Sequence, residues 1–224
     1  MELMLDTANL AQIERGLAAY PAAGVTTNPS ILAREGAAPL WDHLKKIRAL
    51  CGPDRSLHVQ VLGETTDRIV AEAQRIREEL GEQVYIKIPV SPAGLPAIRQ
   101  LSDQGIPVTA TAVYDSLQGM LAAMAGARYI AVYFNRIEAM GGDPDRVIRE
   151  IAASVREGGA KVLAASFHRP EQLTRAYAAG AQGATVSPAL LDEALGAPCI
   201  EKAVADFAAD FHRVFGADAD LTTL

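Results

Sequence analysis

The stretch VYIKIPVSPAG, from Val84 to Gly94, carries a lysine inside an apolar run. The run follows Gly81 and stops at Pro92, and its β-branched residues and turn-forming borders indicate a buried strand. An ammonium group that is buried without a partner costs several kcal/mol, so a strand of this kind normally excludes lysine. Lys87 must therefore be explained by its surroundings or by chemistry.

Similar short runs recur along the chain and are separated by amphipathic patterns with helical spacing. The eight predicted strands cover 2–6, 24–27, 56–62, 83–90, 106–113, 129–135, 161–167 and 183–187. The predicted helices between them cover 11–20, 39–51, 65–80, 93–105, 115–126, 143–159 and 169–180. Eight strands that alternate with helices predict an α/β fold, a single (β/α)8 TIM barrel over residues 1–224. A doubly wound open sheet is the main alternative.

The segment 198–216 predicts an additional C-terminal helix. Its apolar residues recur at intervals of three or four and form one face. They are Ile200, Val204, Phe207, Phe211 and Phe215. This face can pack across its own barrel or on a neighbouring subunit, and the spacing does not decide between the two.

Composition and charge restrict the possible partners and the compartment. Half of the 224 residues are hydrophobic, and the net charge of -6 comes without any basic cluster, which argues against nucleic acid. The isolated Cys51 and Cys199 predict no disulfide framework and favour a reducing cytoplasm. The start MELMLDTANL lacks the features of a signal peptide, and no apolar run approaches the roughly 20 residues of a membrane span.

Metal and nucleotide sites find no support in the sequence. His43, His58, His168 and His212 are scattered, and no HxH or HExxH spacing occurs. Glycine-rich nucleotide motifs of the GxGxxG or GxxxxGK[ST] type are also lacking. We therefore expect neither a metal nor another cofactor.

Alternation along the strands predicts which side chains point into the barrel. On the fourth run Lys87 points inward, because its apolar neighbours point outward at the helices. On the seventh run Leu163 and Ala165 are predicted to point outward and Ser166 inward. The inward polar residues at the strand ends form a predicted ring at the C-terminal mouth, where barrel enzymes place their sites. Its members are Asp6, Asn28, Gln60, Lys87, Thr111, Tyr133, Ser166 and Ser187.

This ring contains the groups needed for Schiff-base chemistry. A lysine in a dry pocket has a lowered pKa, and its neutral amine can attack a carbonyl to give an iminium that accepts electrons. Tyr133 and Asp6 are candidates for moving protons, while Gln60 and Thr111 can hold a water and orient hydroxyls. The alternative for Lys87 is a structural ion pair with Asp6.

An anionic substrate would find cations just past the sixth and seventh strands. Arg136 follows the sixth strand, and Ser166 with either His168 or Arg169 follows the seventh. An arginine with a hydroxyl and backbone N–H groups forms a plausible phosphate clamp. Arg136 could instead make a surface ion pair.

The chain resembles the transaldolase family, and within it the small fructose-6-phosphate aldolase-like branch. The resemblance covers nearly the whole chain through LDTAN, GVTTNPSIL, VQVLGET, YIKIPVSPAGLPAI, GIPVTATAVY, GARYIAVYFNRIEAMGGD and KVLAASFHRP. It implies a class I mechanism on a (β/α)8 barrel without cofactor. By this resemblance Lys87 is the Schiff-base lysine, Asp6 handles protons and donor hydroxyls, and Gln60 and Thr111 hold the catalytic water. The predicted substrate-binding residues are Asn28, Thr27, Arg136, Asn135, Ser166, Ser187, His168 and Arg169, of which Asn28, Ser166 and Arg136 match residues of the family.

Two positions favour the aldolase branch. Transaldolases have glutamate in place of Gln60 and usually phenylalanine in place of Tyr133. A phenol can deliver the proton that releases free dihydroxyacetone, whereas a phenyl ring cannot. We therefore expect cleavage of fructose 6-phosphate, or a related ketose, to dihydroxyacetone and an aldehyde such as glyceraldehyde 3-phosphate. The alternatives are a transaldolase of the pentose phosphate pathway and, more remotely, a non-catalytic sugar-phosphate binder.

The chain departs from the family at the anionic end of the predicted site. Family members often have arginine or lysine where this chain has His168, with Arg169 next to it. Because histidine is shorter and mostly neutral near pH 7, phosphate binding is expected to be weaker. The resemblance also implies assemblies of five or ten chains in which the terminal helix reaches a neighbouring subunit.

Overall fold

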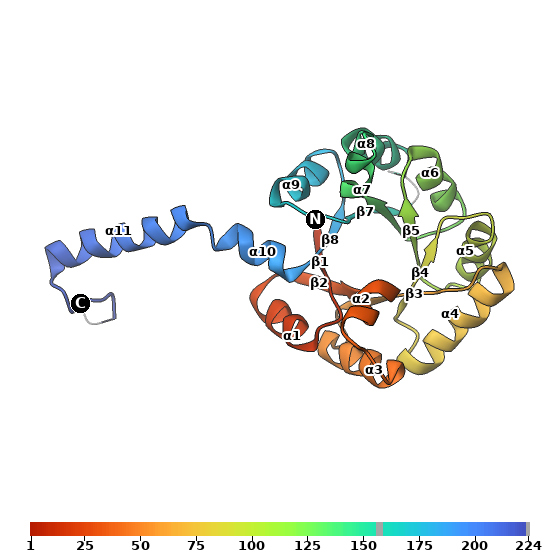
Figure 1. Cartoon of the computed structure of the whole chain (residues 1–224), viewed down its shortest axis with the longest axis horizontal. Coiled ribbons are helices and arrows are strands. Elements are labelled where there is room, and N and C mark those ends of the chain that lie inside the picture. Colours follow the sequence, from red (N-terminus) through yellow and green to blue (C-terminus); the bar gives the residue numbers. More distant parts are fainter. Residues whose placement is uncertain (156–158, 223–224) are drawn as a thin grey trace. The chain divides into compact units, whose positions relative to one another are not determined.

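Eight short strands rich in β-branched residues pair in parallel and in sequence order, and the last pairs with the first. The computed structural model describes residues 1–155 and 159–222. Its contacts divide the chain into two units, Met1–Pro188 and Ala189–Leu224, and the first contains the closed barrel with helices around it (Figure 1). This confirms the predicted TIM barrel and excludes the open sheet.

Six strands are shorter than the predicted runs at one or both ends, β1 matches its run, and β2 begins two residues earlier and ends one residue earlier than predicted. They are β1 (Glu2–Asp6), β2 (Ala22–Thr26), β3 (Ser56–Gln60), β4 (Tyr85–Pro89), β5 (Val108–Val113), β6 (Tyr129–Tyr133), β7 (Lys161–Ala165) and β8 (Gly183–Val186). The register pairs Gln60 with Lys87, and Lys87 with Thr109. The side chains of Gln60 and Lys87 therefore leave neighbouring strands at one level.

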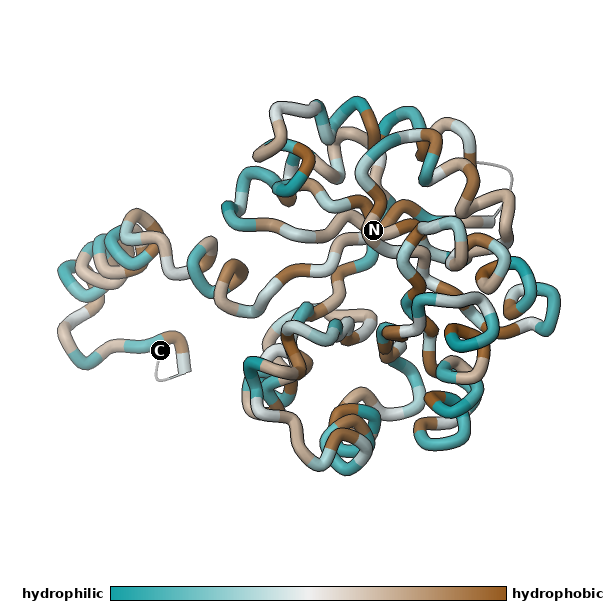
Figure 2. The backbone as a smooth tube through the Cα atoms, turned by 45° about the vertical axis from the view of Figure 1, so that its right-hand side comes forward, coloured by the Kyte–Doolittle hydropathy of each residue, from teal (hydrophilic) through white to brown (hydrophobic). Residues whose placement is uncertain are grey.

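Among the described residues, the barrel unit contains nine helices, and the second unit contains α11 and all of α10 except its first residue. They are α1 (Leu10–Ala19), α2 (Pro29–Arg34), α3 (Leu40–Cys51), α4 (Thr66–Leu80), α5 (Gly94–Asp103), α6 (Ser116–Met124), α7 (Phe134–Ala139), α8 (Pro144–Val155), α9 (Pro170–Ala178), α10 (Pro188–Leu195) and α11 (Pro198–Phe215). Hydrophobic and hydrophilic residues follow one another in short blocks along them (Figure 2). The short α2, α7 and α10 were not predicted. Residues 156–158 of the predicted helix 143–159 lie outside the described residues.

Helix α2 begins directly after β2 because its first residues are strong start signals. The Asn28 side chain accepts a hydrogen bond from the Ile31 N–H at 3.0 Å, and Pro29 occupies the first turn. The same asparagine lines the mouth of the barrel. Capping therefore fixes the position of a predicted site residue.

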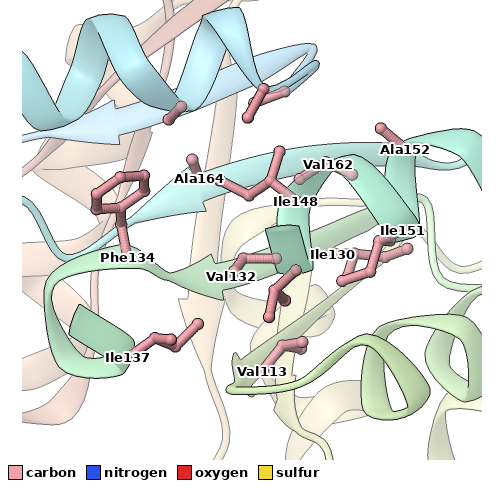
Figure 3. Close-up of a cluster of buried hydrophobic side chains, with 14 of the residues drawn as sticks. Val113, Ile130, Val132, Phe134, Ile137, Ile148, Ile151, Ala152, Val162 and Ala164 are labelled. Carbon is pink, nitrogen blue, oxygen red and sulfur yellow. The ribbon is translucent and has the colours of Figure 1, made fainter. Parts of the chain in front are cut away.

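The outer faces of the strands form one core with the helices. Ile130, Val132 and Phe134 pack with Val162 and Ala164 of β7 and with the apolar face of α8 (Figure 3). The inner faces are different, since Met4, Tyr129 and Leu163 pack on one another inside the barrel, with Tyr85 against them. We call these four residues, together with His58, the lower layer of the barrel interior.

The predicted orientation of β7 is wrong. Val162 and Ala164 face the helices, whereas Leu163 lies in the lower layer and Ala165 lines the mouth. Alternation could not show this, because residues 162–165 are all apolar and a strand buried on both faces carries no polar-apolar period. Ser166 then departs from the strand with a left-handed φ of 63°, which turns it toward the mouth.

The second unit carries the predicted C-terminal helix, α11, which ends at Phe215, one residue earlier than expected. None of its residues is buried, and Val204, Phe207 and Phe215 are all more than half exposed. That the whole chain, residues 1–224, forms one domain stays a prediction. Among the described residues, no helix combines the length and apolar character needed to cross a membrane.

Candidate active site

A cavity of about 620 Å³ opens at the C-terminal ends of the barrel strands. Most of the predicted site residues lie around it, although they are far apart in the sequence. Those lining it are Asp6, Asn28, Gln60, Lys87, Tyr133, Arg136, Ser166, His168 and Ser187. The barrel thus brings an amine, a carboxylate, a phenol and a guanidinium to one cavity.

Lys87 is buried, with 5% of its surface exposed, and its Nζ donates to the Thr27 carbonyl oxygen at 2.9 Å. Burial lowers the pKa of this amine, and the Asp6 carboxylate offsets the effect only in part. Among the described residues Lys87 forms no ion pair within 4.0 Å, so the structural pairing with Asp6 lacks support. The surroundings therefore favour the neutral form of this amine more than water does.

Asp6 is held at the end of β1 by a threonine that the sequence did not single out. Thr26 Oγ1 donates to Asp6 Oδ1 at 2.7 Å and lies 2.6 Å from Thr185 Oγ1. Thr26 is fully buried, so its hydroxyl orients the carboxylate without contact with solvent. The inward alternation of residues 24–27 contained this signal, because Thr26 has the same parity as Asn28.

Tyr133 ends β6 with its phenol facing the cavity. Its oxygen lies 3.1 Å from Thr111 Oγ1, and the Arg136 guanidinium carbon lies 4.7 Å from the ring centroid. Burial raises the pKa of the phenol above its ordinary value, although the bond to Thr111 opposes this. Tyr133 therefore holds its proton at neutral pH and can donate it. Thr111 itself is buried, lies outside the cavity lining and contacts the phenol from behind.

Gln60 presents an acceptor with no protein partner. Among the described residues, its Oε1 is one of three buried side-chain nitrogen or oxygen atoms without a hydrogen bond. Such atoms are rare in folded proteins and need an explanation. Because the residue lines the cavity one strand away from Lys87, a substrate hydroxyl or a water bound there could supply the missing hydrogen bond.

The lower layer beneath Lys87 is uncharged. His58 is stacked on Tyr85 at 4.5 Å between ring centroids, and its ring nitrogens bond Thr109 Oγ1 at 2.8 Å and Ser56 Oγ at 2.9 Å. Burial, with a smaller effect of Lys87, lowers the pKa of His58 to about 3. The imidazole is therefore neutral at physiological pH and places no charge beneath the Lys87 amine.

The side of the cavity where an anionic group is predicted to bind contains Arg136, Ser166 and His168. Arg136 is exposed, and its Nη1 donates to the Tyr114 hydroxyl at 3.1 Å, so no surface ion pair draws it away among the described residues. Arg169 lies outside the lining and pairs with the carboxylates of Glu138 and Glu171 at 3.1 and 2.8 Å. Of the two basic residues, the structure places His168 at the cavity.

Two further predicted residues lie behind the cavity wall. The Thr27 hydroxyl donates to the His58 carbonyl oxygen at 3.1 Å, and only the Thr27 backbone reaches Lys87. The Asn135 amide oxygen accepts from Gln172 Nε2 at 2.9 Å. Conversely, Ser30 and Arg34 line the cavity without having been predicted, because α2 has only six residues and is too short to show a helical period.

The residues present suit carbonyl chemistry at Lys87 more than binding of a metal. Within 1–155 and 159–222, no three His, Cys, Asp or Glu side chains are arranged to hold an ion. The amine, the phenol and the hydroxyl-bound carboxylate together can form an imine and move protons around it.

Comparison with known proteins covers nearly the whole chain. The family described as transaldolase/fructose-6-phosphate aldolase matches residues 3–224. A relative from Streptococcus pneumoniae (strain ATCC 700669 / Spain 23F-1), named probable fructose-6-phosphate aldolase, is 43% identical over 216 residues. The aligned region covers 96% of this chain and 97% of that relative.

Proposed function

Because the chain belongs to the transaldolase/fructose-6-phosphate aldolase family, we propose that it is a class I aldolase that uses Lys87 as its Schiff-base residue. Its substrate is fructose 6-phosphate or a related ketose, and its products are dihydroxyacetone and an aldehyde such as glyceraldehyde 3-phosphate. The observation that carries the proposal is the buried Lys87 amine with its lowered pKa, which faces a cavity containing a phenol and a carboxylate.

The reaction begins when the neutral Lys87 amine attacks the ketose carbonyl and water leaves, which gives an iminium. Removal of the proton from the C4 hydroxyl then breaks the C3–C4 bond, and the electron pair moves into the iminium to form an enamine. The aldehyde departs, C3 of the enamine gains a proton, and water hydrolyses the resulting iminium to release dihydroxyacetone. Tyr133 and Asp6 move these protons, and Gln60 and Thr111 hold the water.

The remaining predicted residues bind the substrate. Arg136, Ser166 and His168 hold the phosphate end, on the side of the cavity formed after β6 and β7. Asn28 contacts the dihydroxyacetone unit from the opposite half of the barrel, after β2. The proposed enzyme of sugar-phosphate metabolism is cytoplasmic and has no nucleic acid or membrane partner, and the free Cys51 and Cys199 support the reducing compartment.

The test is intact mass after incubation with dihydroxyacetone and borohydride, together with cleavage of fructose 6-phosphate without an acceptor aldehyde. We expect one reduced adduct per chain and free dihydroxyacetone in solution. An adduct without free dihydroxyacetone would identify a transaldolase, which needs an acceptor to complete its cycle. If no adduct forms with any small ketose, the Schiff-base proposal is wrong.

We also propose that the apolar face of α11 docks on a neighbouring copy, in an assembly of five or ten chains. Ile200, Val204, Phe207 and Phe215 are 44–72% exposed, and large apolar faces of this kind mark contact surfaces. We expect Phe207→Asp to lower the oligomer mass measured by light scattering after gel filtration. Ala209→Asp, which introduces the same charge on the opposite face of α11, should leave it unchanged. A wild-type chain that is monomeric at micromolar concentration would contradict this prediction.

A further inference from the structure

The side chain of Gln172 is fully buried on α9 and uses its whole hydrogen-bonding capacity. Its Oε1 accepts from the backbone N–H groups of His168 at 2.8 Å and Arg169 at 3.2 Å. Its Nε2 donates to Asn135 Oδ1 at 2.9 Å and to Glu138 Oε2 at 2.6 Å. A side-chain amide has two acceptor positions and two N–H groups, so all four are occupied.

These four bonds join the β7–α9 loop to helix α7, and these two segments carry the residues proposed to hold the phosphate. The acceptor bonds hold the β7–α9 loop, which contains His168. The donor bonds hold α7, in which Asn135 and Glu138 lie on either side of Arg136 in the sequence. One amide therefore sets the separation between the Arg136 guanidinium and the loop opposite it.

Two neighbouring contacts make this junction rigid. The Asn135 N–H donates to the Ser166 carbonyl oxygen at 2.9 Å, which fixes the serine with the left-handed backbone. Glu138 also accepts from Arg175 Nη1 at 2.6 Å and from Arg169 Nη2 at 3.1 Å. The bond from Arg175, followed by that from Gln172, lowers the pKa of Glu138, so the carboxylate stays charged and remains an acceptor.

We propose that Gln172 is a positioning residue that sets the affinity of the site for the phosphate end of its substrate. This inference rests on the proposed function, because it assigns the anion to Arg136, Ser166 and His168. Gln172 touches neither the cavity nor Lys87, and it acts by holding the two loops at the spacing that lets one phosphate contact both. Its loss should therefore impair phosphorylated substrates selectively.

The test compares Gln172→Leu with wild type on two acceptors in the synthetic direction, with dihydroxyacetone as the common donor. For glyceraldehyde 3-phosphate we expect KM to rise at least about tenfold, with kcat changed less than about twofold. For glyceraldehyde without phosphate we expect both constants to stay within about twofold of wild type. Equal losses on the two aldehydes would overturn the proposal and leave Gln172 a purely structural residue.

Gln182→Leu is the matched control. Gln182 lies before β8 at the opposite end of the barrel, and its Oε1 likewise accepts a backbone N–H, from Val162 at 2.7 Å. Its substitution removes a comparable glutamine contact without touching α7 or the β7–α9 loop. We expect the same KM values for both aldehydes as in wild type, and a selective phosphate defect in this control would refute the assignment to Gln172.

A second variant serves if Gln172→Leu does not fold. Gln172→Glu keeps the acceptor for the loop N–H groups but faces Glu138 with a second carboxylate, and adding Glu138→Gln restores a donor between them. We expect the single variant to show the selective KM increase and the double variant to recover at least half of it on a logarithmic scale. No recovery would contradict a role for this hydrogen bond.

Binding of inorganic phosphate, followed by the shift in Tm, separates this proposal from the aldolase proposal. If wild type forms no borohydride adduct but phosphate still raises its Tm more than that of Gln172→Leu, the aldolase proposal fails and the positioning role stands. If phosphate raises both melting temperatures equally while the adduct forms, the positioning role fails and the aldolase proposal stands.

Discussion

Lys87→Met should abolish turnover of fructose 6-phosphate and make the barrel more stable at neutral pH. Without the amine no imine forms, and loss of a covalent nucleophile reduces kcat by roughly 10⁶-fold. Methionine is apolar and similar in length, so it fills the site without desolvating an amine. The expected gain in the free energy of unfolding at pH 7 is about 1–2 kcal/mol, because the Thr27 carbonyl loses its partner while the larger desolvation cost disappears.

The pH dependence gives this prediction its sharpest form. The pKa of Lys87 is lowered in the folded protein and is about 10.4 in the unfolded chain. Between these two values the unfolded chain binds more protons, so the wild-type free energy of unfolding rises with pH. The advantage of Lys87→Met should therefore be largest below the folded pKa and disappear as the pH approaches 10.

Urea unfolding at pH 7, 8, 9 and 10 measures this difference, with borohydride trapping as the parallel test of chemistry. Lys46→Met is the control, because Lys46 is an exposed lysine on α3. Its stability difference from wild type gives the baseline with which the pH trend of Lys87→Met is compared. A Lys87→Met variant that is less stable than wild type at pH 7, or that still forms the adduct, would contradict the assignment.

Tyr133→Phe should convert the enzyme from one that releases dihydroxyacetone into one that retains it. Burial raises the pKa of this phenol, so it carries a proton at neutral pH, and its bond to Thr111 aims it. Removing a positioned proton donor costs about 10²–10⁴-fold in the step that it serves. We expect release of dihydroxyacetone without an acceptor to fall by that factor, while the adduct on Lys87 still forms.

Adding an acceptor aldehyde distinguishes this effect from general damage. The enamine on Lys87 should still add to glyceraldehyde 3-phosphate, so transfer of the three-carbon unit should fall much less than its release. Tyr85→Phe removes a phenol from the lower layer instead and should leave both rates near wild type. Equal losses of transfer and release in Tyr133→Phe would show that the phenol has no special part in release.

The barrel and the position of Lys87 could be predicted because their signals are local. In β4 the single polar residue among apolar neighbours showed which side chains point into the barrel. Most of the polar residues predicted at the mouth of the barrel line the cavity. Strand β7 gave no such signal, since residues 162–165 are uniformly apolar. The left-handed conformation of Ser166 also broke the alternation at the one place where the prediction depended on it.

The rest of the site depended on contacts between distant residues. Whether His168 or Arg169 faces the cavity is decided by Glu138, about 30 positions earlier, which pairs with Arg169 and leaves His168 at the mouth. In the same way, the hydrogen bond from Gln172 holds the Asn135 side chain behind the cavity wall. Spacing along a strand cannot reveal such partners, because they lie on helices that the barrel brings together only after folding.

The residues that pack the interior of this barrel are different from the residues proposed to react, and they lie in different parts of it. Met4, Leu163 and the stacked ring of His58 lie below the cavity and carry no charge at neutral pH, while the groups proposed to react stand on the ends of strands or on the loops that follow. Loop residues can therefore be exchanged without reopening the packing beneath them. For laboratory evolution, Arg136, Ser166 and His168 are the positions at which new acceptor aldehydes can be sought at the least risk to folding, because they line the cavity and lie outside this packing.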